Sequence, residues 1–426
     1  MQYRGDDVKL KQQIGPGTGS PRLVNDRERS SLSPADADAL IRSEFSELRG
    51  SYLDVAARGP LPLSAQRAAE SILRAQSQGS VPKEEWLNLA ETVRAKSARL
   101  LGARPDEIAL TKNTSEGLNI VAAGLQLKAG DRIVVAPSAE HPNNVLPWLW
   151  QAQRRGAEVV LVTPSASETL EQALIHRVDN RTKLVAVTEV DFGTGRRTDL
   201  TVLGNACRAH GAFFLVDAAQ SSGVLRQDMA TQPVDAWATA TQKGLLSPYG
   251  MGLLYVRSEV VEQVVPAALA RFSVDVAAGH EAAGPEEGWQ LRTGARRYEG
   301  GNYNYVGLAA LNASLDLLLQ VGTDEVERRA VEASSKLRSA IQAQGIPLLE
   351  VAPDHRSHIL SIAEKQGSGH DRSESPWIND LSAALNREGV VHSVRRGALR
   401  LSSHIHVLPN FVDHVIGGVE TWQKSR

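Results

Sequence analysis

Short apolar runs alternate with helical stretches from about residue 107 to residue 256. The runs are rich in valine, leucine and phenylalanine, and they cover residues 132–138, 158–165, 183–192, 213–219, 236–241 and 252–256. Buried strands of a parallel sheet form continuous apolar runs of this kind, and the intervening helices supply the crossovers. The pattern therefore predicts an α/β fold whose mostly parallel sheet is covered by helices on both faces.

The two ends of the chain follow different patterns. Residues 33–48 begin with Ser33 and Pro34 and continue with helical periodicity, which predicts a capped helix. Residues 1–32 are polar and carry the glycine-rich and proline-rich stretch IGPGTGSP, so we expect a flexible arm or an extended segment over a partner subunit. After a long apolar helix at 306–322, the C-terminal part mixes helices with strand-like runs. This mixture predicts a second, smaller α+β domain.

Composition narrows the kind of partner. The chain has 426 residues, with 47 basic and 49 acidic side chains and a formal net charge of -2. No global field attracts nucleic acid or an anionic membrane, so small molecules are the expected partners. No apolar run approaches the roughly 18 residues of a membrane span, and we expect a cytoplasmic protein. The single cysteine, Cys207, excludes an internal disulfide and any multi-cysteine metal cluster.

Candidate chemistry centres on two residues. Lys243 lies among small and apolar residues in the stretch TATQKGLLSPYG, where desolvation lowers the pKa of an amine and makes it usable as a nucleophile or base. Asp217 ends the run FFLVD, and the carboxyl ends of strands in open α/β sheets face the crevice where ligands bind. Taken singly, they would be read as a loop lysine and a helix cap. Their combination predicts a site at this edge of the sheet.

The stretch VDAAQSSGVLRQDM, followed by DAWATATQKGLLSPYGMGLLYV, resembles the class V aminotransferase family of pyridoxal-phosphate (PLP) enzymes. That family includes cysteine desulfurases, isopenicillin N epimerase-like proteins, kynureninases and carbon-sulfur lyases. Five further segments fit in the family's order over roughly residues 50–420: YLDVAARGPLP, LTKNTSEGLNIVAAGL, AEHPNNVLPW, RRYEGGNYNYVGLAAL and GALRLSSHIH.

The resemblance implies a fold and a domain organisation. The fold is type I of the PLP-dependent transferases, an α/β class with a mostly parallel seven-stranded sheet and a smaller α+β domain. The large PLP-binding domain is expected at 61–309, and the small domain at 33–60 together with 310–426. Residues 1–32 form the flexible N-terminal arm that precedes both.

The resemblance also implies catalytic and cofactor-binding residues. Lys243 matches the lysine that holds PLP as a Schiff base and, once released by substrate, moves protons. Asp217 matches the carboxylate beneath the pyridine nitrogen, and Gln220 the group that hydrogen-bonds the ring oxygen. His141 matches the aromatic side chain that stacks on the cofactor.

The phosphate and the substrate have their own implied partners. The phosphate group is expected at the helix start formed by Thr114, Ser115 and Glu116. Asn302 stands where family members reach the phosphate of the neighbouring subunit, which implies a homodimer with shared sites. Arg400 matches the arginine that grips the substrate carboxylate in a bidentate fork. Further substrate contacts are expected from the segment that contains Ala57 and Arg58.

The chain departs from the family pattern around the lysine. Many members have a histidine directly before the lysine and a serine three positions before it, whereas this chain has Gln242 and Ala240. We therefore expect Thr241 or Thr239 to take part in phosphate anchoring, beside Gln242. The segment TEVDFGTGRR offers Asp191 or Phe192 where desulfurases commonly place an asparagine near the ring oxygen.

The most informative departure concerns sulfur. Sulfur-transferring desulfurases carry a nucleophilic cysteine on a loop shortly before the carboxylate-binding arginine, and HSVRRGALRLSS contains none. Cys207 lies in a predicted helix, where it is expected to be buried rather than catalytic. A persulfide-forming desulfurase is therefore disfavoured. His404 and His406 alternate on a strand without acidic or cysteine partners at ligand spacing, so no metal site is expected.

These observations predict a PLP-dependent enzyme that acts on an amino acid or a cysteine S-conjugate. Carbon-sulfur β-elimination is the preferred reaction, since it needs no second nucleophile, and secondary metabolism is the expected setting. The alternatives are an aminotransferase, an epimerase, an oxidative (decarboxylating) deaminase, and a PLP-fold binding protein without turnover. The sequence leaves the substrate side chain open.

Overall fold

The structure is a computed structural model that describes residues 32–80, 82–276, 288–407 and 409–425. The N-terminal arm expected at 1–32 therefore lies outside the described residues, apart from residue 32. The helix predicted at 33–48 is α1 (Pro34–Glu44). It starts where the sequence indicates, because the Ser33 side chain accepts a hydrogen bond from the amide of Asp36.

A seven-stranded sheet forms the centre of the molecule, with the strand order β2-β8-β7-β6-β5-β3-β4. Its strands are β2 (Ile108–Thr111), β3 (Arg132–Val135), β4 (Glu158–Leu161), β5 (Thr182–Thr188), β6 (Phe213–Asp217), β7 (Ala236–Ala240) and β8 (Gly252–Val256). The neighbours from β7 through β4 are parallel, whereas β8 runs antiparallel to both β7 and β2. Each apolar run from 132 to 256 coincides with one of these strands to within one residue at its start, and the predicted mostly parallel sheet is confirmed.

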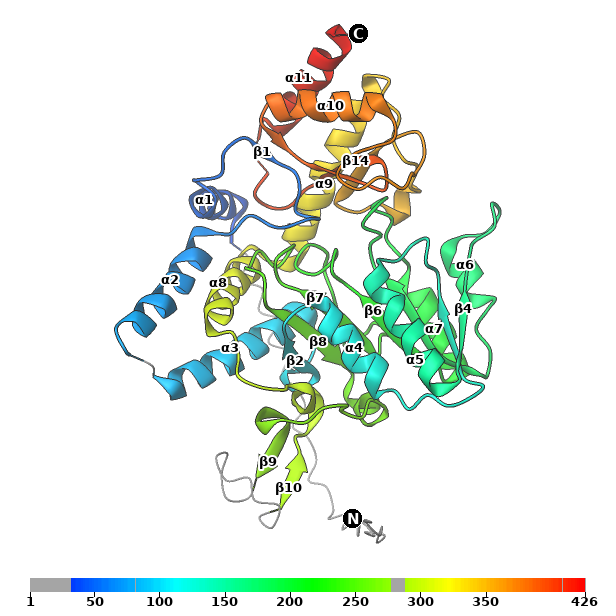
Figure 1. The fold of residues 1–426 in the computed structure, drawn as a ribbon. Helices are drawn as coiled ribbons and strands as arrows, with labels where there is room; N and C mark the ends of the chain where they lie inside the picture. The colour runs from blue at the N-terminus through cyan, green and yellow to red at the C-terminus, as the bar shows by residue number, and fades with distance from the viewer. Residues whose placement is uncertain (1–31, 81, 277–287, 408, 426) are drawn as a thin grey trace, which may run out of the picture.

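Helices cover both faces of this sheet (Figure 1). Alternate residues of β5 lie in different apolar cores: Val185 and Val187 in one, Leu184 and Ala186 in the other. The first core includes residues of α3 (Lys83–Leu101), α6 (Leu170–Ile175), α7 (Leu200–His210) and α8 (Tyr305–Val321), and the second includes residues of α4 (Thr114–Gly124) and α5 (Leu146–Arg155). The period of two along a strand thus divides the strands' apolar side chains between two layers of helices.

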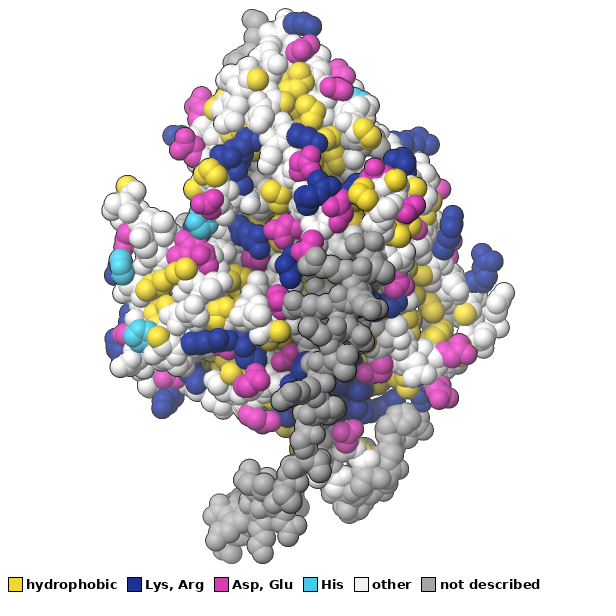
Figure 2. Space-filling model, turned by 180° about the vertical axis from the view of Figure 1, so that it is seen from behind, with side chains coloured by type: hydrophobic (Ala, Val, Ile, Leu, Met, Phe, Trp, Pro, Cys, Tyr) yellow, Lys and Arg dark blue, Asp and Glu magenta, His cyan; other side chains and the backbone are white. Residues whose placement is uncertain are grey.

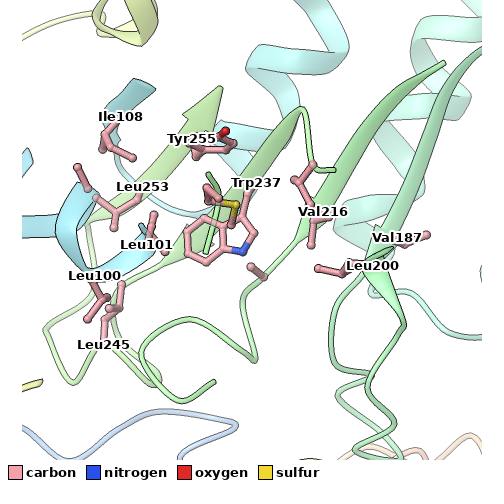
Figure 3. Close-up of a cluster of buried hydrophobic side chains, with 14 of the residues drawn as sticks. Leu100, Leu101, Ile108, Val187, Leu200, Val216, Trp237, Leu245, Leu253 and Tyr255 are labelled. Atoms are coloured by element: carbon pink, nitrogen blue, oxygen red, sulfur yellow. The ribbon is translucent and has the colours of Figure 1, made fainter. Parts of the chain in front are cut away.

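Trp237 of β7 marks the centre of the first core. Figure 3 shows its indole among Leu101, Leu245 and Leu253, and the side chain is fully buried. α2 (Leu63–Ser77) packs along α8 at the outer side of this region.

The C-terminal part forms a second unit at one end of the sheet (Figure 1). Its strands are β11 (Ile359–Ile362), β13 (Ser393–Arg395) and β14 (Ala398–Ser402) in one antiparallel sheet, and β1 (Ser51–Tyr52) paired with β12 (Val390–Val391) in another. Its helices are α9 (Thr323–Ala343), α10 (Pro376–Arg387) and α11 (Phe411–Lys424). A separate hairpin joins β9 (Val274–Val276) to β10 (Trp289–Leu291).

The apolar cores indicate where the two units meet. The C-terminal unit has its own core, which includes Leu53, Leu337 and Leu401. Leu308, Leu311 and Val321 of α8 belong instead to the core beneath the central sheet. The domain boundary at residue 310 stays a prediction, and the side-chain packing of α8 favours one near the break between α8 and α9.

Surface charge is mixed. Lysine and arginine side chains are interspersed with acidic ones on the face that Figure 2 shows. Over the described ranges, no single helix has the length and apolar character needed to cross a membrane; α8 and α9 meet the criterion only as a pair bent by 84°.

Candidate active site

Lys243 and Asp217 meet at the carboxyl edge of the central sheet. Asp217 is the last residue of β6, and Lys243 follows the end of the neighbouring parallel strand β7. Burial lowers the pKa of Lys243 to about 8, while the negative charge of Asp217 acts in the opposite direction. Burial also raises the pKa of Asp217, whose Oδ1 accepts a hydrogen bond from the amide of Ala219 at 3.0 Å. An amine that titrates near neutral pH beside a buried carboxyl group is suited to proton transfer.

The backbone around Lys243 is tightly held. The amide of Gly59 donates to the carbonyl of Gln242 at 2.8 Å, and the amide of Leu246 donates to the carbonyl of Lys243 at 3.0 Å. A Cβ atom at Gly59 would lie 2.3 Å from the Lys243 carbonyl oxygen, so only glycine permits this approach. The segment that contains Ala57 and Arg58 therefore lies directly against the lysine loop.

His141 lies at the start of a short 3-10 turn, where its Nδ1 accepts a hydrogen bond from the amide of Asn143 at 3.2 Å. Its ring contacts the edge of Phe192, with 5.4 Å between the ring centroids. The guanidinium of Arg396 lies 4.4 Å from the centroid of the Phe192 ring. Burial, followed by the positive charges of Lys243 and Arg396, lowers the pKa of His141. A neutral imidazole suits stacking on a cofactor ring.

The start of α4 lies where the sequence predicts it. Asn113 caps the helix by accepting a hydrogen bond from the amide of Glu116 at 2.9 Å. Thr114 is buried, and the hydroxyl of Ser115 accepts a hydrogen bond from the Asn143 side chain at 2.7 Å. The carboxylate of Glu116 accepts a hydrogen bond from the amide of Lys112. Repulsion between anions disfavours this carboxylate as a phosphate ligand, which leaves the helix N-terminus and its hydroxyl groups as the attractive features.

A cavity of about 790 Å³ opens beside this helix start. Gln242 and Asn302 line it together with Asn113 and Glu116 of the same chain. Thr241 is engaged elsewhere, because its hydroxyl lies 3.1 Å from the carbonyl of Pro248 and 3.2 Å from that of Met251.

Thr239 is engaged in the same way, with its hydroxyl close to the backbone carbonyls of Ala218 and Ala240. Of the residues expected to replace the family's histidine and serine, Gln242 alone lines the cavity. Its role toward the phosphate stays a prediction.

Gln220 provides a test of whether a cofactor fits here. Its Nε2 donates to the carbonyl of Ala56 at 3.1 Å, but its buried Oε1 has no partner in the described part of the chain. An unpaired buried amide oxygen costs free energy, as does the buried carboxyl group of Asp217. A heteroaromatic ring with a protonated nitrogen and a hydroxyl substituent would satisfy both groups. The residues present therefore fit PLP.

Arg400 lies in the middle of β14 and is buried. Its Nη1 donates to the carbonyl of Phe192 at 2.8 Å, and its Nη2 donates to the Ser393 hydroxyl at 3.0 Å and lies 3.5 Å from the Asp54 carboxylate. The Nε atom is buried without a partner among the described residues. Burial lowers the pKa of Arg400 to about 10, so the group stays cationic at neutral pH and can bind a carboxylate.

Sequence reasoning missed several parts of this arrangement. Asp54, which is far from Arg400 in sequence, pairs with it inside the C-terminal unit, and the guanidinium of Arg396 stacks on the ring of Phe192. Asn113 has a detectable signal, since an asparagine three residues before Glu116 is a helix-start pattern. The structure places Asp191 in a turn, where its carboxylate accepts hydrogen bonds from the amide of Gly193 and the hydroxyl of Thr194.

Comparison with known proteins identifies the family. The model of the aminotransferase class-V family matches residues 51–393. The chain belongs to this family. A probable cysteine desulfurase of Methanothermobacter thermautotrophicus is 33% identical over 299 residues, which are 68% of this chain and 72% of the relative. A probable cysteine desulfurase of Pyrococcus abyssi is 30% identical over 349 residues, covering 77% of this chain and 82% of the relative.

Solved structures show the same fold. A cysteine desulfurase from Thermococcus onnurineus superposes with a TM-score of 0.78 at 24% identity, covering 93% of this chain and 100% of that one. The cystine C-S lyase C-DES superposes with a TM-score of 0.77 at 21% identity, covering 88% and 98%. Fold type I is thereby confirmed, and the class V assignment makes the protein a PLP-dependent enzyme, as the motifs predict. PLP supplies an electron sink for the bonds to the amino-acid Cα atom.

Proposed function

We propose that the protein cleaves the carbon-sulfur bond of an S-substituted cysteine by β-elimination, without passing sulfur to a cysteine of its own. The similarity to cysteine desulfurases supports carbon-sulfur chemistry. The proposal that no sulfur passes to the protein rests on the position of Cys207, the one cysteine in the sequence. Cys207 lies on α7, 1% exposed, and burial raises the pKa of its thiol to about 12. A thiol that stays protonated inside a core is not a nucleophile.

The segment before Arg400 supports the same conclusion. β13 ends at Arg395 and β14 begins at Ala398, and these two residues pair across the hairpin. Only Arg396 and Gly397 form the turn, both with positive φ angles of 48° and 73°. A two-residue turn of this type leaves no longer loop between β13 and β14, and neither turn residue is a cysteine.

The residues of the site divide the reaction between them. Arg400, with its buried Nε, is proposed to bind the substrate carboxylate and so fix the Cα atom relative to Lys243. Lys243, with its lowered pKa, removes the Cα proton. Asp217 would hold the ring nitrogen of PLP by charge and hydrogen bonding, and His141 would stack on the ring. The start of α4, with Gln242 and Asn302 beside the same cavity, would hold the phosphate.

The overall change balances without an oxidant or reductant. The Cα–H bond and the Cβ–S bond break, the electron pair of the latter leaves with sulfur, and sulfur takes up a proton. The remaining 2-aminoacrylate reacts with one water to give pyruvate and ammonium. An S-substituted cysteine and water thus give a thiol, pyruvate and ammonium.

The proposal predicts that Cys207 is dispensable. A Cys207→Ala enzyme should release thiol and pyruvate from an S-alkyl cysteine at a rate within about twofold of wild type, because a buried thiol takes no part in the chemistry. A Lys243→Ala enzyme, the matched control, should lose about 100-fold to 10,000-fold in turnover. Rates follow from coupled pyruvate detection and thiol titration. A Cys207→Ala enzyme that stays folded but loses turnover would contradict the proposal.

Finer assignments stay predictions. Transamination, epimerisation and oxidative deamination leave different products from β-elimination, and product analysis separates them. We propose a homodimer, supported by the class V assignment. Asn302, expected to reach the phosphate of the neighbouring subunit, lines a cavity with Gln242 of its own chain. A cytoplasmic location and a role in secondary metabolism likewise stay predictions.

A further inference from the structure

A buried histidine lies between the strand of Arg400 and the loop of Lys243. His404 follows the end of β14 and is 1% exposed. Its Nε2 lies 3.0 Å from the carbonyl oxygen of Gly244 and 3.0 Å from that of Gly223. Gly244 directly follows Lys243, so the imidazole touches the backbone of the lysine loop itself.

The contacts of His404 fix its protonation and its tautomer. Carbonyl oxygens only accept hydrogen bonds, so Nε2 carries the proton and shares it between the two carbonyls. Nδ1 accepts a hydrogen bond from the amide of Ile405 at 2.7 Å, so it carries none. Burial lowers the pKa of His404 to about 4, which keeps the ring neutral at physiological pH. Both nitrogens are thus committed to the backbone.

Glycine packing adds to this constraint. A Cβ atom at Gly223 would lie 2.4 Å from the carbonyl oxygen of Gly244, and one at Gly244 would lie 2.3 Å from the carbonyl oxygen of Ser222. The two backbone segments therefore touch directly, with His404 bridging their carbonyl groups. Gly59 closes the loop from another side through its hydrogen bond to Gln242.

We propose that His404 is a positioning residue for Lys243: by binding the carbonyl of Gly244, it fixes the lysine loop relative to the strand that carries Arg400. Lys243 would then be aligned with the substrate carboxylate through one segment of five residues, Arg400 to His404. This role concerns how the lysine is held, so it does not depend on which reaction follows.

Other charged groups near Lys243 also affect its pKa, so a test of His404 must take them into account. Asp217 raises the pKa of Lys243, and Arg400 and Arg395 lower it. Lys243 in turn lowers the pKa of His141. His404 acts on none of these groups by charge, since it is neutral, and its effect on the lysine must come from position and hydration.

His406 offers a matched control. It is buried on the same segment, lies parallel to His404 with 6.0 Å between ring centroids, and its Nε2 lies 3.1 Å from the carbonyl of Tyr52. It touches no backbone atom of the lysine loop in the contacts of the described chain. A His406→Phe variant therefore removes a buried histidine without releasing Gly244.

The experiment uses the purified PLP-loaded protein without substrate. The absorbance of the lysine-bound cofactor is titrated against pH, and cofactor loss is followed during dialysis, for wild type, H404F, H404Q and H406F. Thermal unfolding of each variant reports general loss of stability. Because no substrate is present, failure of the proposed reaction would leave this test unaffected.

We expect H404F to raise the titration midpoint by about 0.5 pH units or more, because a loosened lysine loop admits water that favours the charged form. Cofactor loss should be about tenfold faster, the factor that corresponds to about 1.4 kcal/mol. H404Q, whose amide can still donate to the carbonyls, should recover most of both properties. H406F should match wild type in both, even at a similar loss of thermal stability.

The proposal is overturned if H404F and H406F give the same midpoint and the same rate of cofactor loss. If H404F does not fold, the same two measurements are made on His404→Asn. Its side chain is polar but too short to donate a hydrogen bond to the carbonyl of Gly244. A wild-type midpoint and wild-type cofactor retention in that variant would also overturn the proposal.

Discussion

At the scale of single residues, the burial of Lys243 favours its reactivity but opposes the stability of the folded chain. Desolvation by the surrounding apolar and backbone groups makes the ammonium form unfavourable, and this lowers the pKa to about 8. The same desolvation that prepares the amine for proton transfer must reduce the stability of the folded chain at neutral pH. Sequence pointed to this residue because the flanking small residues are local. The hydrogen bonds of the neighbouring residues Gln242 and Gly244 with Gly59 and His404 depend on distant segments.

The conflict gives a pH-dependent prediction. Since the pKa of Lys243 is lowered from 10.5 to about 8 on folding, the unfolded chain binds more protons in this window, and stability rises with pH across it. With PLP removed from both proteins, Lys243→Met should be more stable than wild type at pH 7, and the difference should shrink toward pH 10. Urea unfolding at both pH values measures it. Lys112→Met, at an exposed lysine, is the control, and an equal advantage for Lys243→Met at both pH values would contradict the account.

At the scale of elements, the turn of the hairpin β13–β14 lies against the segment that carries His141. Its two turn residues, Arg396 and Gly397, both have positive φ angles. Arg396 accepts this conformation while its guanidinium donates to the carbonyls of Ser138 and Glu140 and stacks on Phe192. The sequence predicted strand-like runs in the C-terminal part. The contacts of this turn with the His141 loop were not predicted, because they join residues far apart in the chain.

Gly397 allows the hairpin to be tested directly. In a Gly397→Ala variant, the alanine would have an unfavourable positive φ of 73°, and its Cβ atom would lie 3.2 Å from the Cα atom of Gly367. We expect a loss of about 2 kcal/mol in the free energy of unfolding, since the conformation alone costs about 1 kcal/mol. Gly211→Ala is the control, because Gly211 has a φ of 68° but open space around its Cβ position. Equal losses measured by urea unfolding would show that the contact with Gly367 does not constrain the turn.

At the scale of the whole molecule, the apolar runs predicted the sheet and the family resemblance predicted its seven strands. The apolar runs and the family motifs each consist of residues that are close together in the chain, so both predictions could be made from the sequence. The placement of Asp54 was not, because it depends on β1 of the N-terminal part pairing with β12 of the C-terminal part. That pairing brings Asp54 beside Arg400 within the C-terminal unit.

The central claim is that sulfur leaves the substrate by elimination rather than by transfer to the protein. The most direct measurement is mass spectrometry of the carbon product after PLP-loaded protein acts on an S-alkyl cysteine, with and without oxygen. The account predicts pyruvate and thiol in equal amounts under both conditions. Alanine with sulfur bound to the protein, a new amino acid formed from an added keto acid, or an oxygen-dependent aldehyde would contradict it.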